Sequence, residues 1–193
     1  KGAYDILLGT QMVAKGHDFL NVTAVGVITA DSVLHIPVYT AAERTFNLLT
    51  QAAGRAGRGK KSGRVVIQTY NPDHYAIIHS TNHDYESFFK EEMIGREALQ
   101  YPPIGEMIQI TLLDTTLSKV KERATELANT LRKASHGQRI DILGPYENGA
   151  TKIRDMYRLC IMIRGINLQH IKSYMYHSDI FTMPHMYIDV DPV

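Results

Sequence analysis

The chain has 193 residues, with 21 lysines and arginines against 20 aspartates and glutamates, and a formal net charge of +1. This balance excludes an overall basic field, so any nucleic-acid binding must come from a local patch. The single cysteine, Cys160, excludes an intrachain disulfide and a multi-cysteine zinc site, and it is typical of a reducing compartment such as the cytoplasm. No charge-free apolar run is long enough to span a bilayer, so no membrane partner is expected.

The first half of the chain predicts strands separated by crossovers. Residues 4–9, YDILLG, form a short apolar run typical of a buried strand, and residues 21–30 are rich in Val, Ile and Thr. Residues 40–53 predict a helix, because a Thr-x-x-Glu capping box starts at Thr40 and apolar residues then recur on one face. Residues 63–70 predict a third strand. Strands connected in this way imply a parallel α/β sheet.

The second half predicts a separate small domain. A helical tract over 73–100, broken near Asn82, ends at the paired prolines of 101–106, which indicate a domain boundary. The elements that follow are strands 107–114, 139–145, 157–165 and 186–193 and helices 117–135 and 167–178. This β-α-β-β-α-β order predicts a split sheet with its helices on one face. We therefore expect a domain with a partial parallel sheet over 1–104 and a small α+β domain over 105–193.

Residues 48–70, LLTQAAGRAGRGKKSGRVVIQTY, hold Arg55 and Arg58 among several glycines, between the predicted helix and the third strand. Glycines allow a sharp turn there, and ligands of parallel sheets bind outside the carboxyl ends of the strands. Arginines fixed in such a turn are permanently charged forks that suit phosphate oxygens. Gln51, one helical turn earlier, is suited to orienting a water or a phosphate. Taken alone, GRAGR is equally consistent with a solvated basic turn.

Two longer segments resemble a known family. DILLGTQMVAKGHDFLNVTAVGVITAD and AAERTFNLLTQAAGRAGRGKKSGRVVIQTYNP are similar to motifs V and VI of superfamily 2 helicases, and within them to the bacterial replication-restart DNA helicases. The similarity is strong over residues 2–105 and continues more weakly through YPPI, ILGP and YR. It implies a RecA-like second helicase lobe followed by a domain with the fold of ribosomal protein S10.

The resemblance also implies roles for particular residues. Gln51, Arg55 and Arg58 match the motif that faces the ATP phosphates, with Arg58 as the arginine finger. Five residues of the motif V segment are implied as well, Gly16 and Asp18 toward the nucleotide and Thr10, Gln11 and Lys15 toward the DNA backbone. The implied cofactors are ATP and magnesium in the full-length protein, with zinc only in a cysteine-rich segment upstream of residue 1. The implied partners are branched or forked DNA, single-strand-binding protein and other primosome proteins.

Some elements of a complete motor are not in this sequence. It has no GxxxxGK[ST] phosphate loop and no DExH-type acid cluster to hold magnesium. We therefore expect the chain to carry the arginine half of one ATP site, to belong to a longer 3′→5′ helicase, and to hydrolyse no ATP by itself. The segment 145–158 lacks the Ala-Pro-Ile run that the family has after its Gly-Pro, so no contact is transferred to it.

Two other functions stay open. One is a related superfamily 2 translocase for branch migration or transcription-repair coupling, which would have similar motifs V and VI. The other is a non-catalytic DNA- or protein-docking module in which the C-terminal domain does all the binding. Within that domain, Lys152, Arg154 and Arg158 either contact phosphates or simply solvate a loop. His79 and His83 have a zinc-like spacing, but the sequence offers no third ligand, which favours a surface pair.

Overall fold

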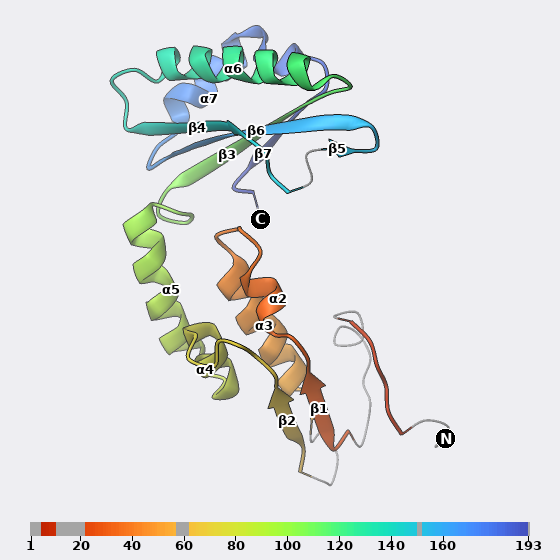
Figure 1. Cartoon of the computed structure of the whole chain (residues 1–193). Helices are drawn as coiled ribbons and strands as arrows, with labels where there is room; N and C mark the ends of the chain where they lie inside the picture. The colour runs from red at the N-terminus through yellow and green to blue at the C-terminus, as the bar shows by residue number, and fades with distance from the viewer. Residues whose placement is uncertain (1–4, 11–21, 57–61, 150–151, 193) are drawn as a thin grey trace. The chain divides into compact units, whose positions relative to one another are not determined.

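The computed structural model describes residues 5–10, 22–56, 62–149 and 152–192 (Figure 1). The chain forms two compact units, residues 1–95 and residues 96–193. Each unit has its own sheet and its own core. The division falls within one long helix, and the predicted boundary between residues 104 and 105 stays a prediction, as does the likeness to a RecA lobe and to ribosomal protein S10.

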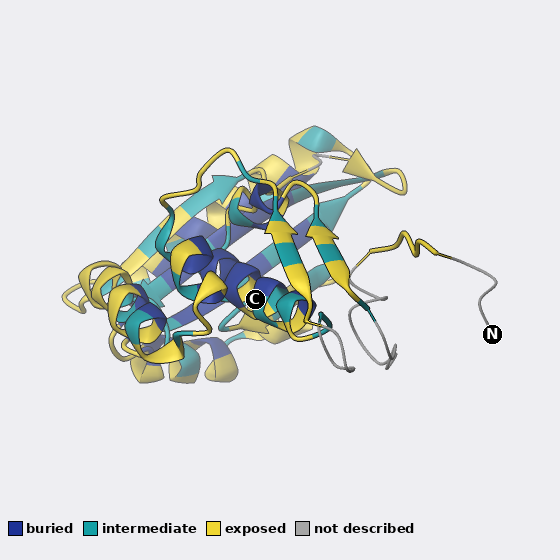
Figure 2. Ribbon diagram, turned by 90° about the horizontal axis from the view of Figure 1, so that it is seen from below, coloured by how far each residue is buried: buried dark blue, intermediate teal, exposed yellow. Residues whose placement is uncertain are grey.

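The first unit contains the predicted parallel pair of strands. Strand β1 (Ala24–Val27) lies beside β2 (Arg64–Ile67), with the first residues of the two strands opposite each other and likewise the last. Helix α2 (Asp31–Leu34) and helix α3 (Ala41–Ala53) form the crossover between them. Half-buried and exposed residues alternate along both strands (Figure 2), so one face of the pair is turned to the helices. The parallel α/β arrangement is thereby confirmed, with shorter strands than predicted.

The predicted strand over residues 4–9 is wrong for the residues that the structure describes. Residues 5–10 form no strand, and Ile6 and Leu8 are each 86% exposed. An apolar run becomes a strand only when a neighbouring strand satisfies its backbone groups. Within the described part of this unit, β1 and β2 pair only with each other. Tyr4, which the prediction also covered, lies outside the described residues.

Three helices supply most of the buried residues in the core of the first unit. Phe46 and Leu49 of α3 are buried as the helical periodicity predicted, and Phe46 stacks on Phe88 with ring centroids 4.4 Å apart. Phe88 belongs to helix α5 (Tyr85–Leu99), which follows helix α4 (Tyr75–Thr81). The chain breaks between α4 and α5 at Asn82, as predicted, and the next residue is in the left-handed conformation.

The predicted capping box at the start of α3 is wrong. Thr40 precedes the helix, but its side chain makes no capping hydrogen bond, and its buried hydroxyl has no partner among the described residues. A capping side chain normally needs an extended backbone at the cap residue. Thr40 instead has φ −88° and ψ 4°, which is outside that region.

The second unit is an antiparallel sheet covered on one face by helices (Figure 1). Its strands run in the order β4-β6-β3-β7, and a two-residue strand β5 pairs with β6. The elements are β3 (Glu106–Asp114), α6 (Leu117–Ala134), β4 (Ile140–Tyr146), β5 (Lys152–Ile153), β6 (Met156–Gly165), α7 (Gln169–His177), the 3₁₀ helix η1 (Asp179–Thr182) and β7 (Met186–Val190). The predicted split sheet with helices on one face is confirmed, while β5 and η1 were not predicted.

Alternate residues of the strands form the core of the second unit. Ile110 of β3 lies opposite Ile161 of β6 and Ile188 of β7, on the face that the helices cover. The stripe predicted on α6 faces the same core, and its members Val120, Ala124, Leu127 and Leu131 are all buried. Cys160 is buried as well, with its Sγ 3.4 Å from the hydroxyl oxygen of Thr111. Within the described ranges, no helix combines the length and apolar character needed to cross a bilayer.

Candidate functional site

Helix α3 ends where the glycine- and arginine-rich stretch begins. The backbone N–H of Gly54 donates to the carbonyl of Thr50 at 3.0 Å, and the N–H of Arg55 donates to that of Ala52 at 3.1 Å. The N–H of Ala56 continues this tightening by donating to Ala53 at 3.1 Å. Gly54 has φ −64°, so the last helical turn does not use the left-handed freedom of glycine. Gly57 and Gly59, on which the predicted sharp turn also rests, lie outside the described residues.

Three of the eight predicted site residues are described by the structure. Gln51 is exposed on the last turn of α3, and Arg55 is half-buried in the turn that follows, so both belong to the C-terminal end of this helix. Thr10 is exposed and lies in neither a helix nor a strand. The other five predicted residues lie outside the described residues: Gln11, Lys15, Gly16, Asp18 and Arg58.

A buried carboxylate connects the segments that leave the two parallel strands. Asp31, which follows β1, is 1% exposed and accepts hydrogen bonds from three groups that follow β2. Its Oδ1 accepts from the Thr69 hydroxyl at 2.8 Å and from the Asn71 side-chain amide at 3.0 Å. Its Oδ2 accepts from the backbone N–H of Tyr70 at 2.9 Å. We call Asp31, Thr69, Tyr70 and Asn71 the Asp31 clamp.

The clamp stabilises the ionised form of Asp31. The pKa of Asp31 is lowered to about 2, mainly by the hydrogen bond from the backbone N–H of Tyr70. Burial acts in the opposite direction, and the hydrogen bonds from the Thr69 and Asn71 side chains lower the pKa further. The strand ladder also continues into the clamp, since the N–H of Gln68 donates to Val27 at 2.9 Å and that of Ala30 to Gln68 at 3.1 Å. The carboxyl edge of the parallel pair, where α/β proteins bind ligands, is therefore fixed by both backbone and side chain.

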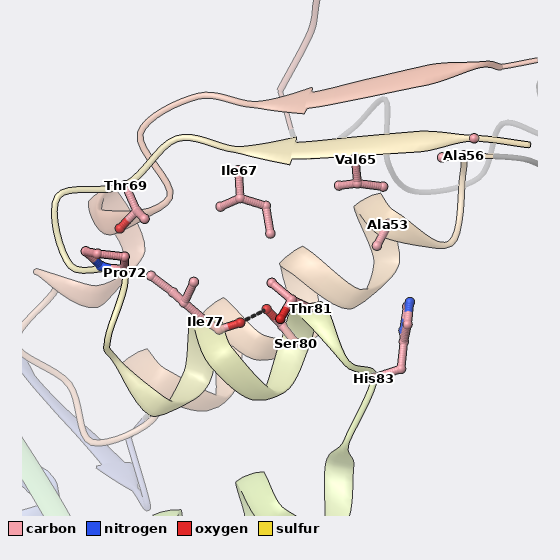
Figure 3. A pocket seen from close by; sticks show the side chains of 11 residues that line it. Ala53, Ala56, Val65, Ile67, Thr69, Pro72, Ile77, Ser80, Thr81 and His83 are labelled. Carbon is pink, nitrogen blue, oxygen red and sulfur yellow. Dashed lines mark hydrogen bonds between the residues drawn. The ribbon is translucent and has the colours of Figure 1, made fainter.

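A cavity of about 520 Å³ lies between β2, α3 and α4 (Figure 3). Its walls include Val65 and Ile67 of β2, Ala53 of α3 and Ile77 of α4, and Gly63 lines it as well. The hydroxyls of Ser80 and Thr69 that reach it already have partners, since that of Ser80 donates to the carbonyl of Ile77 at 2.8 Å and that of Thr69 donates to Asp31 at 2.8 Å. The described lining contains no acidic residue and no arginine or lysine, and its polar side chains are those of Thr69, Ser80, Thr81 and His83.

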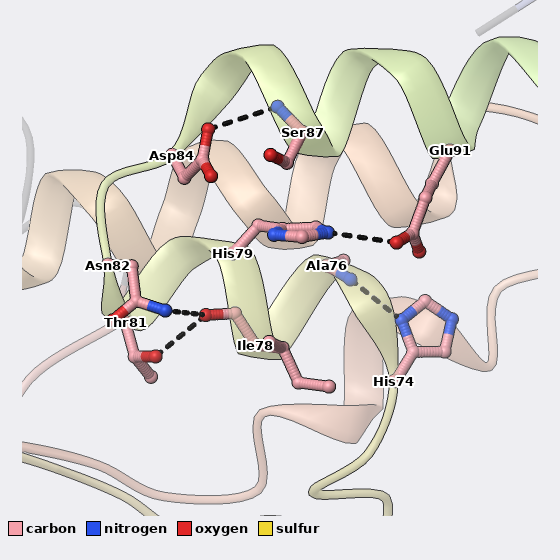
Figure 4. Close-up of polar contacts among 9 residues, drawn as sticks. All are labelled: His74, Ala76, Ile78, His79, Thr81, Asn82, Asp84, Ser87 and Glu91. Carbon is pink, nitrogen blue, oxygen red and sulfur yellow. Dashed lines mark hydrogen bonds and ion pairs between the residues drawn. The ribbon is translucent and has the colours of Figure 1, made fainter.

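The histidines of α4 have structural partners. His79 Nε2 lies 3.2 Å from Glu91 Oε1 on α5, which joins the two helices (Figure 4). Burial lowers the pKa of His74, and its Nδ1 accepts from the backbone N–H of Ala76 at 3.2 Å at the start of α4. His83 is in the turn between the helices with φ 52°. Across the described ranges, no group of three or more histidine, cysteine or acidic side chains is arranged to hold a metal ion.

Sequence reasoning missed the clamp because it joins residues 38 to 40 positions apart. The available signal was positional: an aspartate directly follows one predicted parallel strand, and Thr and Asn follow the next. The predicted candidates around Arg55 and the clamp both belong to the first unit. They lie at opposite ends of the parallel pair, because Arg55 precedes β2 whereas the clamp follows both strands, so the arginine stretch is not at the carboxyl edge where the sequence predicted it.

The second unit identifies the family. Residues 97–193 match the family of the primosomal protein N C-terminal domain, which is half of the chain and nearly all of its second unit. The chain belongs to this family.

Several curated relatives extend the similarity into the first unit. The chain is 48% identical over 164 residues to the replication restart protein PriA of Bacillus subtilis (strain 168), which covers 85% of the chain and 20% of the relative. It is 39% identical over 199 residues to the protein of the same name from Treponema pallidum (strain Nichols), covering all of the chain and 30% of the relative. The chain is 37% identical over 200 residues to the replication restart protein PriA of Synechocystis, which covers 100% of the chain and 23% of the relative. The chain therefore spans less than a third of each relative.

Proposed function

We propose that the chain acts in replication restart, as the C-terminal portion of an ATP-dependent 3′→5′ DNA helicase. The proposal is supported by the names of the relatives and by the long ungapped strings that resemble motifs V and VI. In this proposal the first unit supplies the arginine half of an ATP site. The second unit docks on forked DNA, on single-strand-binding protein and on other primosome proteins.

The observation that carries the proposal is the end of α3. Phe46 and Leu49 anchor this helix in the core, so its last turn is a rigid base for Gln51 and for the arginines that follow. In phosphoryl transfer, an arginine aimed at the γ-phosphate stabilises the charge that develops in the transition state. A rigid base matters here because a guanidinium that must reorganise at the moment of reaction loses much of its effect.

The remaining predicted residues have proposed roles on the same unit. Gly16 and Asp18 contact the nucleotide, and Thr10, Gln11 and Lys15 contact the DNA backbone through a hydroxyl, an amide and an ammonium, which suit phosphate oxygens. Because the sequence has no phosphate loop and no DExH-type acids, we propose that ATP and magnesium are held mainly by residues of the longer protein. Zinc likewise belongs to the upstream segment in this proposal.

The test compares the full-length protein with this chain. We expect the full-length protein to hydrolyse ATP in a DNA-stimulated manner and to unwind a forked duplex that it enters from a 3′ single strand. We expect this chain to do neither, because the arginines accelerate phosphoryl transfer only around a bound nucleotide. DNA-stimulated turnover by this chain, or no turnover by the full-length protein, would contradict the proposal. Equal unwinding of forked and unforked substrates would instead favour a general translocase.

A further inference from the structure

A small hairpin projects from the sheet of the second unit where β6 begins (Figure 1). We call residues 152–158 the β5–β6 hairpin. Lys152 lies opposite Tyr157, and Ile153 lies opposite Met156, so a two-residue turn connects the strands. The turn residues Arg154 and Asp155 both have left-handed backbones, with φ of 49° and 63°. Such turns favour Asn and Gly, so local turn chemistry does not explain an arginine at the tip.

Two arginines of this hairpin lack acidic partners. Arg154 is exposed and Arg158 is half-buried, and the side chain of neither forms an ion pair or a hydrogen bond within the described ranges. Other arginines of the same unit are engaged: Arg164 bonds Asp141 at 3.1 Å, and Arg123 bonds the Leu113 carbonyl at 3.2 Å. The two hairpin guanidinium groups therefore keep their full donor capacity.

The acids closest to these arginines in the pairing pattern are already neutralised. Asp155 forms an ion pair with Lys152, whose Nζ lies 2.9 Å from Asp155 Oδ1, and the same ammonium lies 5.6 Å from the centre of the Tyr157 ring. Asp114, which is opposite Tyr157 at the end of β3, lies 3.6 Å from Arg123. Glu147, which follows β4, is exposed at this end as well, so the exposed charges here include the guanidinium of Arg154 and the carboxylate of Glu147, with the half-buried Arg158 beside them.

The opposite end of the same sheet has a different charge distribution. Arg164 near the end of β6 forms an ion pair with Asp141 of β4. Asp189 is exposed on β7, the strand at the other edge of the sheet. Arg139, directly before β4, is also exposed and unpaired within the described residues. The residue after Arg139, Ile140, lies opposite Gly165 at the far end of β6. At the usual rise per residue of a strand, Arg139 is therefore about 30 Å from the hairpin.

We propose that the β5–β6 hairpin binds a duplex arm of forked DNA, with Arg154 and Arg158 on backbone phosphates. The inference rests on the proposed function and adds the surface that meets the duplex. A two-stranded ribbon fits the major groove, and guanidinium forks match phosphate oxygens. Ile153 is 41% exposed and lies on the same side as Met156 and Arg158, since paired residues of antiparallel strands share a face. It supplies an apolar contact for sugar or thymine methyl groups.

The test is the salt dependence of DNA binding by this chain. A fluorescent forked DNA is titrated with the parent and with the Arg154→Gln/Arg158→Gln double variant between low and moderate salt, with anisotropy as the readout. We expect the double variant to bind on the order of 10-fold more weakly at low salt and to lower the slope of log K against log salt by about 2. The Arg139→Gln variant is the matched control and should keep the parent slope.

The proposal is overturned if the double variant keeps the parent affinity and slope, if Arg139→Gln lowers the slope equally, or if the parent does not bind the fork. It is also overturned if the double variant binds DNA normally but loses binding to polyglutamate, because the hairpin would then be a site for an acidic protein. Unchanged melting temperatures show that both variants fold. If the full-length protein hydrolyses no ATP while the double variant loses its slope, only the helicase proposal fails.

Discussion

The two units differ in how completely each encloses its own sheet. In the second unit, helices cover one face of a sheet in which β6 and β3 each have partners on both sides. In the first unit, the described sheet has two strands, and the side away from the helices carries Ile28 at 73% and Val66 at 53% exposure. A two-stranded sheet is marginal on its own. The first unit therefore depends on its helices and on the Asp31 clamp, whereas the second depends on a packed core.

This difference has a functional parallel. The predicted nucleotide-facing residues belong to the first unit, whose sheet is the less enclosed of the two among the described residues. A nucleotide site that is shared with other parts of a longer protein needs an open surface on which those parts can pack. The second unit, which matches the family over almost its whole length, is a self-contained scaffold, and in our proposal it presents the hairpin that binds DNA. The stability of each unit can be probed separately.

The largest expected effect is in the core of the second unit. Ile110 is 0% exposed and packs between two neighbouring strands, so Ile110→Ala should lower the free energy of unfolding by about 2–5 kcal/mol through lost burial and a new cavity. The matched variant in the first unit is Ile28→Ala, which should change it by less than about 0.5 kcal/mol. Urea unfolding followed by circular dichroism measures both. Equal losses would show that the two sheets are enclosed alike.

A smaller effect, confined to the first unit, is expected at the Asp31 clamp. Asp31→Asn replaces one carboxylate oxygen by an N–H₂ group, and the remaining oxygen can keep the Thr69 and Asn71 bonds while the Tyr70 N–H then faces a donor. The segments after β1 and β2 should therefore separate more easily, with faster hydrogen exchange at the Tyr70 amide. Asp31→Glu tests whether charge alone suffices, because its longer side chain cannot keep all three bonds. Unchanged exchange at Tyr70 in Asp31→Asn would show that the clamp does not hold this edge.

The clamp also predicts a pH dependence. The pKa of Asp31 is about 2 in the folded chain and below its unfolded value near 3.8, so its contribution to stability is present above pH 4 and is lost as the pH falls toward 2. Between pH 4 and pH 2, acid unfolding monitored at the first unit should therefore show that the parent loses more stability than the Asp31→Asn variant, each relative to its own stability at neutral pH. The variant has no carboxylate at this position to protonate. An identical relative acid response in parent and variant would contradict a folded pKa this low.

The smallest effect is expected at Thr40. Because its hydroxyl makes no capping bond and is buried without a partner, Thr40→Val should leave stability unchanged or slightly increase it. Loss of a working N-cap would instead cost about 1 kcal/mol. Thermal unfolding of Thr40→Val is compared with that of Ser118→Ala, an exposed change in the first turn of α6. A clear loss of stability in Thr40→Val alone would show that Thr40 is a working N-cap.

Much of the fold follows from local periodicity. The α6 stripe was predictable because Val120, Ala124, Leu127 and Leu131 repeat at helical spacing, and burial of that face is the dominant favourable term. The parallel pairing of β1 and β2 was predictable because a helix separates two β-branched runs. The predicted strand at residues 4–9 failed because an apolar run does not specify its partner.

The parts that sequence could not supply depend on distant contacts. The clamp needs Asp31 to meet groups 38 to 40 residues away, and nothing local in either segment encodes that meeting. Strand β5 has only two residues, too few for any period, and it forms because Lys152 and Ile153 pair with β6. The lack of acidic partners at Arg154 and Arg158 is likewise visible only when their neighbours are placed. The roles of Gln51, Arg55 and Arg58 stay predictions.

The most direct test of the central claim is Arg58→Ala in the full-length protein, with steady-state ATP turnover and DNA-binding anisotropy measured on the same samples. An arginine that meets transition-state charge should lose on the order of 10³-fold in turnover when removed, while DNA affinity changes little because phosphate contacts are shared by many residues. Arg58→Lys should fail nearly as badly, since an ammonium cannot reproduce the fork. Arg64→Ala, at the exposed start of β2, is the matched control. Parent-like turnover with lost DNA affinity in Arg58→Ala would contradict the claim and make this stretch a DNA clamp.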